Sequence, residues 1–92
     1  MKKTRCEQKK PVEFKFHADP GKNIVVAGDF NNWNPTKMKL IDNGDGIYTI
    51  TVQLTPGCHQ YKFLVDGSWQ IDFANPEMVQ NDFGSMNSVI ML

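Results

Sequence analysis

Apolar and polar residues alternate with a period of two along most of this chain, and turn-forming residues break the alternation at short intervals. The clearest case lies at residues 48–54, where Tyr48, Ile50, Val52 and Leu54 alternate with polar side chains. Successive side chains of a β-strand point to opposite faces, so this pattern predicts strands that bury one face. Helical periodicity is absent almost throughout the sequence, which makes all-β the expected fold class.

The alternation and the turn residues together predict about seven short strands. We place them at residues 13–18, 23–28, 38–41, 48–54, 58–65, 69–72 and 88–92. The strongest hairpin signal is Asn43-Gly44-Asp45-Gly46, because asparagine and glycine accept the positive φ that tight turns need. Residues 73–86 show no regular period and are expected to form a long loop. Many short strands separated by turns are typical of an immunoglobulin-like β-sandwich, with a small barrel as the alternative.

The charge of the chain is divided unevenly along its length. The first ten residues hold five lysine or arginine residues and one glutamate, whereas the remainder holds five basic and nine acidic residues. We therefore expect residues 1–10 to be a disordered basic tail and residues 11–92 to form one domain. The acidic domain argues against nucleic-acid binding, which needs a basic surface. A role of the tail in electrostatic docking is the weaker alternative.

Neither a membrane partner nor a secretory route is indicated by the sequence. No stretch approaches the roughly 20 apolar residues of a membrane span, and no apolar run follows the basic N-terminus. We expect Cys6 and Cys58 to be free thiols in a reducing compartment, and hence a cytoplasmic protein. The two cysteines have neither the ligand spacing of a zinc site nor the Cys–Trp–Cys arrangement of antibody domains.

Catalytic signatures are weak, and no cofactor or metal ion is expected. The only histidines are His17 and His59, and His59 falls on the apolar face of its strand. The residue types of a serine–histidine–aspartate triad are present in Ser68, His59 and Asp66, but nothing in the sequence orders these groups. Most aspartates lie beside turns, where their side chains commonly bond the backbone, so paired glycosidase carboxylates are not indicated. We therefore expect a domain that is not an enzyme.

Two tryptophans lie outside any apolar alternation. Trp33 is embedded in a polar run at residues 31–35, and Trp69 follows a tight turn. Each could fold back over one end of the sandwich, but we favour a stacking platform. Sugar rings lie flat on indole, and their hydroxyls need amide or ammonium partners. Side chains of that kind are Asn31, Asn32, Asn34, Gln60, Lys62, Gln70, Asn81 and Asn87. Stacking on nucleic-acid bases is disfavoured by the acidic domain.

Four segments carry a family resemblance, and they occur in a fixed order. They are GDFNNW at 28–33, DNGDGIY at 42–48, GCHQYKFLVDGSW at 57–69 and NDFGSMN at 81–87. Together they resemble the carbohydrate-binding modules of family 48. That family includes the glycogen-binding domain of the β subunit of AMP-activated protein kinase and N-terminal domains of branching and debranching enzymes. The resemblance covers roughly residues 11–92, and the string YKFLVDGSW at 61–69 is its most specific part.

The resemblance implies an immunoglobulin-like early-set sandwich that binds α-1,4-linked glucans such as glycogen, starch and maltooligosaccharides. By correspondence with the family, Trp33 and Trp69 would stack on glucose rings. Lys62 and Asn87 match the lysine and asparagine that bond sugar hydroxyls. Phe83 stands where kinase-type domains usually have a leucine that reaches into the curved oligosaccharide, so we include it in the site.

Two alternatives to a free-standing glucan-binding module follow from the same resemblance. One is a protein-interaction or regulatory domain that docks on a kinase. The other is an appended domain of a glucan-processing enzyme. The chain also departs from the family at Phe73, where a proline usually follows the aspartate, and we expect the loop path after Asp72 to differ there.

Overall fold

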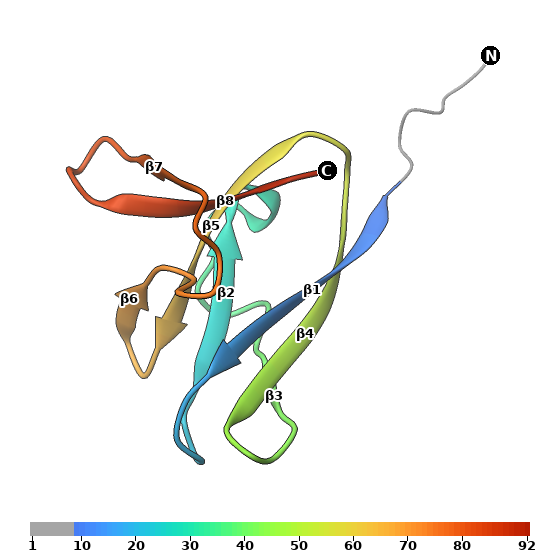
Figure 1. The fold of residues 1–92 in the computed structure, drawn as a ribbon, viewed down its shortest axis with the longest axis vertical. Coiled ribbons are helices and arrows are strands. Elements are labelled where there is room, and N and C mark those ends of the chain that lie inside the picture. The colour runs from blue at the N-terminus through green and yellow to red at the C-terminus, as the bar shows by residue number, and fades with distance from the viewer. Residues whose placement is uncertain (1–8) are drawn as a thin grey trace.

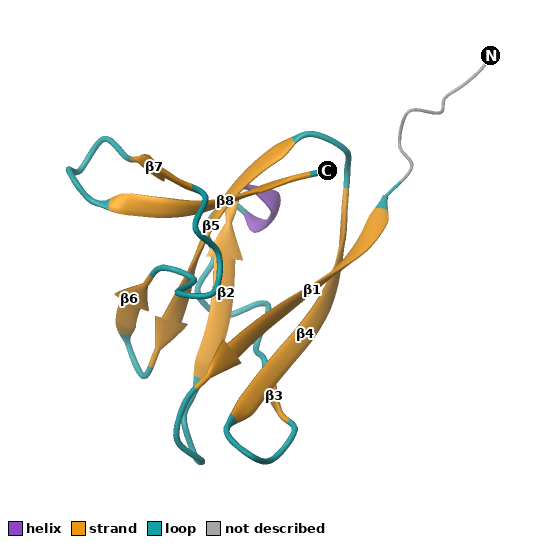
Figure 2. Cartoon of the chain, viewed as in Figure 1, coloured by secondary structure: helices purple, strands orange, loops and turns teal. Residues whose placement is uncertain are grey.

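A computed structural model of the chain describes residues 9–92, so most of the basic tail predicted for residues 1–10 lies outside the described residues. The described part contains eight strands and one 3-10 turn, and Figure 2 shows that strands dominate it. The strands are β1 (Lys10–His17), β2 (Ile24–Gly28), β3 (Ile41–Asp42), β4 (Ile47–Leu54), β5 (Cys58–Val65), β6 (Ser68–Gln70), β7 (Met78–Gln80) and β8 (Met86–Met91). The 3-10 turn is η2 (Asp29–Asn31), directly after β2.

Two antiparallel sheets form the sandwich seen in Figure 1. The first sheet has the order β1-β4-β3, and β1 pairs with β4 along its whole length. The second sheet has the order β2-β5-β8-β7, with β6 also paired to β5. Two separate sheets confirm the predicted sandwich and exclude the small barrel. No helix within residues 9–92 is long and apolar enough to cross a membrane.

Strand β5 is the centre of the second sheet. One of its edges pairs with β2, while its other edge pairs first with β8 over residues 58–61 and then with β6 over residues 63–65. Lys62 lies at the point where the pairing partner changes. The loop between β6 and β8, together with the hairpin of β7 and β8, therefore lies beside the middle of β5, and that hairpin extends to the left in Figure 1.

The core lies between the two sheets and is built from the inward positions of the alternating strands. Its aromatic centre pairs Phe14 with Tyr61, whose ring centroids are 4.8 Å apart, and Phe16 with Phe63, at 5.0 Å. Edge-to-face rings at such distances stabilise a core beyond their area burial alone. The buried hydroxyl of Tyr48 donates to the carbonyl oxygen of Asp19 at 2.6 Å and so ties the β1–β2 loop to the core.

Two parts of the predicted strand layout were wrong. The strand expected at residues 38–41 lies at Ile41–Asp42, where it pairs with β4, and Lys39 forms only an isolated bridge with Val25. This segment crosses from one sheet to the other and is too short to show a period. The loop expected at residues 73–86 contains β7, and β8 begins at Met86 instead of residue 88. All three residues of β7 are exposed, so no burial alternation marks the strand.

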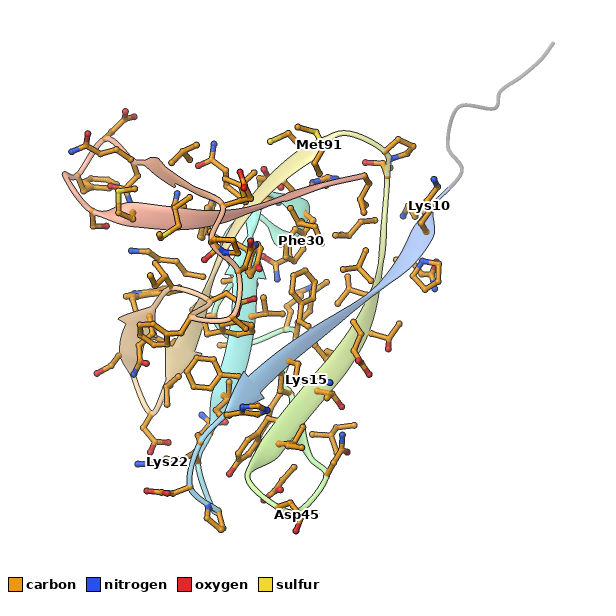
Figure 3. The ribbon with its side chains drawn as sticks, in the orientation of Figure 1. Lys10, Lys15, Lys22, Phe30, Asp45 and Met91 are labelled. Carbon is orange, nitrogen blue, oxygen red and sulfur yellow. The ribbon has the colours of Figure 1, made fainter. Side chains whose placement is uncertain are left out.

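Phe30 lies toward one end of the sandwich, and two loops lie at the other end (Figure 3). Phe30, in η2, packs against the core and stacks on Phe14 with ring centroids 5.6 Å apart (Figure 3). Lys22 and Asp45 lie at the opposite end, in the loops that precede β2 and β4. Neither tryptophan belongs to the core cluster or packs against it, which disfavours the alternative that either one folds back over an end of the sandwich.

Candidate functional site

An open hollow of about 590 Å³ lies over the outer face of the second sheet. Its lining consists of aromatic, amide, hydroxyl and ammonium side chains, namely Trp33, Lys62, Trp69, Asn81, Phe83, Ser85 and Asn87. All five site residues predicted from the sequence are in this lining. They come from four separate places in the chain: the turn after η2, β5, β6 and the end of the β7–β8 hairpin.

Trp33 is held by a compact turn that begins at Gly28. The Asn31 side chain accepts a hydrogen bond from the Gly28 amide at 3.0 Å and donates to the Val26 carbonyl oxygen at 3.2 Å. The Trp33 amide then donates to the Gly28 carbonyl oxygen at 2.8 Å. Asn32 and Trp33 both have positive φ, near 57°, which reverses the chain and leaves the half-buried indole on the surface of the sheet. Gly28 is required here, because a Cβ atom would lie 2.4 Å from the Gln60 carbonyl oxygen.

Trp69 is held on the sheet surface by strand pairing. It lies in β6 opposite Leu64 of β5, and 47% of its surface is exposed. The preceding turn is stabilised by Asp66, which accepts a hydrogen bond from the Asn23 amide at 2.8 Å. That bond, together with the nearby Lys22 ammonium group, lowers the pKa of the Asp66 carboxyl. Strand pairing thus fixes the backbone of Trp69, and the indole stays exposed.

Lys62 and Asn87 are polar residues of the same lining. The Lys62 Nζ donates to the Ser85 Oγ at 2.9 Å. Asn87 is only 6% exposed, and its Nδ2 donates to the Gln60 Oε1 at 3.0 Å. Its Oδ1 accepts a bond from the Asn81 Nδ2 at 3.1 Å. A ligand that bonds Asn87 would therefore use its second amide hydrogen, use the second acceptor site of its Oδ1, or replace one of these protein partners.

Phe83 lies in the loop that joins β7 and β8, and 94% of its surface is exposed. The sequence predicted that Phe83 lies outside the core, and the structure confirms this. Its contact with a ligand stays a prediction. A large aromatic ring exposed in a cluster with two other aromatic rings marks a binding surface more often than a chance feature.

The sequence missed the two residues that connect this lining. Ser85 was not considered, and Asn81 was counted only as one amide among many. The available signal was the spacing of Asn81 and Gly84, since asparagine followed by glycine is typical of a turn held by the asparagine side chain. Some of the other expected amides serve the local backbone instead, as Asn34 does by bonding the Thr36 amide at 2.9 Å.

The possible catalytic set written from the sequence is not assembled. His59 lies near the start of β5, whereas Asp66 and Ser68 follow its end, roughly 20 Å away along the strand. His59 instead bonds the Thr55 carbonyl oxygen through Nε2 at 2.8 Å and Asp29 Oδ1 through Nδ1 at 3.0 Å. The Thr55 bond and the Asp29 carboxylate raise the pKa of His59, against the opposing effect of burial. Among residues 9–92, no three histidine, cysteine or acidic side chains are placed to hold a metal ion.

Two further groups lie beneath the site and serve the fold. The hydroxyl of Tyr61 donates to the Asp72 carboxylate at 2.7 Å and accepts a bond from the Asn75 Nδ2 at 3.1 Å. Burial is the main cause that raises the pKa of Tyr61 well above its ordinary value, so the hydroxyl stays protonated. Asp72 also accepts a bond from the Ala74 amide at 3.0 Å, which fixes the loop path beside Phe73.

Comparison with known proteins identifies relatives of this arrangement. Residues 10–92 match the family described as the glycogen recognition site of AMP-activated protein kinase. Curated relatives include the mouse 5'-AMP-activated protein kinase subunit beta-2, which is 37% identical over 85 residues, or 92% of this chain. The pig subunit beta-1 is 34% identical over 85 residues, also 92% of this chain.

The chain corresponds to one part of these relatives. It spans 30% of the length of the mouse beta-2 subunit and 29% of the human beta-2 subunit, which is 37% identical over 84 residues. It spans 66% of the pig beta-1 sequence. The similarity therefore concerns this domain and not the remainder of the kinase subunits.

Proposed function

The chain belongs to the family of glycogen recognition sites of AMP-activated protein kinase, and we propose that its hollow binds α-1,4-linked glucans without converting them. The observation that carries the proposal is the convergence of Trp33, Trp69 and Phe83 around one hollow whose lining also includes Lys62. These side chains come from segments up to 50 residues apart in the chain, so their meeting is a property of the fold.

Stacking and hydrogen bonding would divide the work of recognition. The C–H faces of glucose rings are apolar and match the exposed indole and phenyl faces. Lys62 and the second amide hydrogen of Asn87 would donate to sugar hydroxyls. The hollow is open, so the bound glucan would keep much of its hydration, and we expect a modest affinity governed by the stacked rings.

An α-1,4-linked chain suits this layout because its linkage curves successive glucose rings. A curved chain can present neighbouring rings to platforms that face one hollow from different sides. A β-1,4-linked glucan is straight and would reach fewer of the three platforms at once. Discrimination between the two linkages is therefore the sharpest chemical test of the proposal.

The test is a titration of the domain with maltoheptaose, β-cyclodextrin and cellohexaose, followed by amide chemical shifts. We expect the two α-1,4-linked ligands to shift the amides of residues 33, 62, 69 and 81–87, and cellohexaose to leave them unchanged. Retardation of the domain by glycogen in a native gel provides an independent check. Shifts confined to the sheet β1-β4-β3, or equal responses to cellohexaose, would contradict the proposal.

A role in a larger assembly is the second candidate, and the names of the kinase-subunit relatives favour it. The hollow occupies one face only, and Ile41, Phe73 and Met91 are exposed elsewhere, at 66%, 73% and 73%. In this reading residues 11–92 form a regulatory domain that docks on a cytoplasmic kinase or a glucan-processing enzyme. Retained folding without any glycogen retardation would favour docking over glucan binding.

A further inference from the structure

Because Phe83 is highly exposed, burial against the protein does not keep its ring in place. The ring makes little contact with the protein, since 94% of the residue surface is exposed. A ring on a mobile loop would lose conformational freedom on binding, and that loss weakens affinity. The bonds around the loop at residues 81–85 show what orders it.

The Asn81 side chain uses its complete bonding capacity inside this loop. Its Oδ1 accepts hydrogen bonds from the Phe83 amide at 2.9 Å and from the Ser85 amide at 3.1 Å. Its Nδ2 donates to the Ser85 Oγ at 2.9 Å and to the Asn87 Oδ1 at 3.1 Å. An asparagine amide offers two acceptor sites and two donor hydrogens, and all four are occupied here.

The backbone of the loop closes on the same residue. The Asn81 amide donates to the Ser85 carbonyl oxygen at 2.8 Å, and the Gly84 amide donates to the Asn81 carbonyl oxygen at 3.2 Å. Gly84 has a φ of 81°, which glycine adopts without strain. Asn81 therefore bonds the amide of Phe83 and also bonds Gly84 and Ser85, the two residues that follow it.

Two further bonds connect this loop to the sheet beneath the hollow. The Ser85 Oγ that Asn81 contacts also accepts the bond from Lys62, and the Asn87 that Asn81 contacts donates to Gln60. Lys62 and Gln60 are outward residues of β5. The loop is thus anchored to the central strand of the sheet and is not an independent flap.

We infer that Asn81 is a positioning residue for the glucan site, which orders the β7–β8 loop so that Phe83 stands in the hollow before any ligand arrives. The inference rests on the proposed function of that hollow. It assigns to Asn81 an effect on affinity that passes through another residue, without contact between Asn81 and the sugar. The loop makes no contribution to the core cluster, so this effect is separable from stability.

The test is a double-mutant cycle of Asn81→Ala and Phe83→Ala, read by affinity for β-cyclodextrin and by thermal unfolding. We expect Asn81→Ala to weaken binding about three- to tenfold in the parent domain, as for the loss of one pre-ordered side chain. In the Phe83→Ala background the same change should weaken binding less than about twofold, because interacting residues are not additive. Asn43→Ala is the matched control, since it removes an exposed side-chain bond from the β3–β4 turn of the other sheet.

A second measurement reads the loop without ligand. The backbone order parameter of Phe83 should be near 0.85 in the parent domain and should fall below about 0.6 in Asn81→Ala. Asn81→Asp keeps both acceptor bonds to the backbone and loses both donated bonds. This variant should keep the ordered Phe83 backbone and bind with intermediate affinity, which also covers the case of an Asn81→Ala domain that does not fold.

The outcomes separate the two proposals. Absence of β-cyclodextrin binding by the parent domain overturns the proposed function, and with it the binding role of Asn81. Binding by the parent domain with an equal loss from Asn81→Ala in both backgrounds overturns the role of Asn81 alone. Unchanged affinity and unchanged order at Phe83 in Asn81→Ala do the same.

Discussion

The two faces of strand β5 do different work with adjacent residues. Tyr61, Phe63 and Val65 point into the sandwich and are at most 8% exposed, whereas Gln60 and Lys62 point outward toward the hollow and its polar network. The inner residues are held by packing from both sheets. The outer residues are held by hydrogen bonds to the β7–β8 loop. A period of two in the sequence therefore separates the residues that fold the domain from those proposed to bind glucan.

The free energy of unfolding should respond differently to truncation of inner and of outer side chains. Inner positions lose both hydrophobic transfer energy and packing when truncated. Of the outer aromatics, Trp69 and Phe83 are exposed and Trp33 is half-buried in the free domain, so their truncation should remove less from the folded state than truncation of a core residue. Stability and affinity should respond to different substitutions, even where the substituted residues are neighbours in the chain.

The largest effect is expected at the inner face. Phe63 is fully buried and contacts Phe16 and Tyr61, with ring centroids 5.0 and 5.8 Å away. Phe63→Ala should lower the free energy of unfolding by about 3–5 kcal/mol, measured by chemical denaturation. The folded fraction should still bind β-cyclodextrin, and a specific loss of affinity there would break the separation of the two faces.

The outer face should show the reverse behaviour. Trp33→Ala and Trp69→Ala should each weaken maltoheptaose binding by about 1–3 kcal/mol, which corresponds to about five- to 150-fold in the dissociation constant. Both variants should keep a cooperative thermal transition, because neither indole belongs to the core cluster. Loss of that transition would mean that the tryptophan concerned supports the fold.

Gly28 lies at the end of β2, where both the backbone of Gln60 and the ring of Phe30 approach it closely. A Cβ atom there would approach the Gln60 carbonyl oxygen to 2.4 Å and the Phe30 ring to 2.6 Å. Gly28→Ala should therefore lower the free energy of unfolding by about 1–3 kcal/mol and should also weaken glucan binding, since the Trp33 turn starts at this residue. Thermal unfolding and a β-cyclodextrin titration measure the two effects, and a neutral result in both would disprove the close approach.

The same contrast explains what could be predicted from the sequence. The alternation of β4 and β5 was visible because one face is buried, and the positions of these two strands in the chain followed from it. Strand β7 was missed because Met78, Val79 and Gln80 are all exposed, so that burial leaves no period. The strand at residues 38–41 was misplaced because the chain changes sheets within it.

Some residues of the candidate site could likewise be predicted from the sequence, and others could not. Trp33 and Trp69 stood out because aromatic residues in polar turns conflict with local preference. The fold brings them together with Phe83, and only the family resemblance could anticipate that meeting. The spacing of Asn81 and Gly84 indicates a turn, but the bonds that Asn81 and Ser85 make there depend on the geometry of a loop with irregular backbone.

A smaller effect is expected from His59, which supports the end of the sandwich near the Trp33 turn. Its two ring nitrogens both face acceptors, the Thr55 carbonyl oxygen and Asp29, and this favours the protonated ring. The pKa of His59 is raised in the folded state. Its contribution to stability is therefore complete below the unfolded pKa of about 6.5 and is lost as the pH rises through the folded pKa.

The measurement for His59 is the free energy of unfolding as a function of pH. The parent domain should lose less than about 1 kcal/mol across this range, because the side chain of the Asp29 partner is 42% exposed and solvent screens the pair. Among residues 9–92, Lys9 and Cys58 are the other titratable groups that line the same surface. His59→Gln should flatten the profile, whereas His17→Gln, at an exposed position of β1, should not.

The smallest expected effect is that of salt on glucan binding. Glucans are neutral, and the Lys62 ammonium group would act as a hydrogen-bond donor beside Ser85 and not as a counter-charge. Affinity for maltoheptaose should change less than about twofold between about 50 mM and about 500 mM salt. Deletion of residues 1–8, which carry part of the basic charge, should leave affinity unchanged for the same reason.

A steep fall in affinity with salt would instead indicate an anionic ligand, since release of counterions from each bound phosphate produces that slope. Stacking would then no longer account for recognition on the outer face, whereas the packing of the inner face would be unaffected.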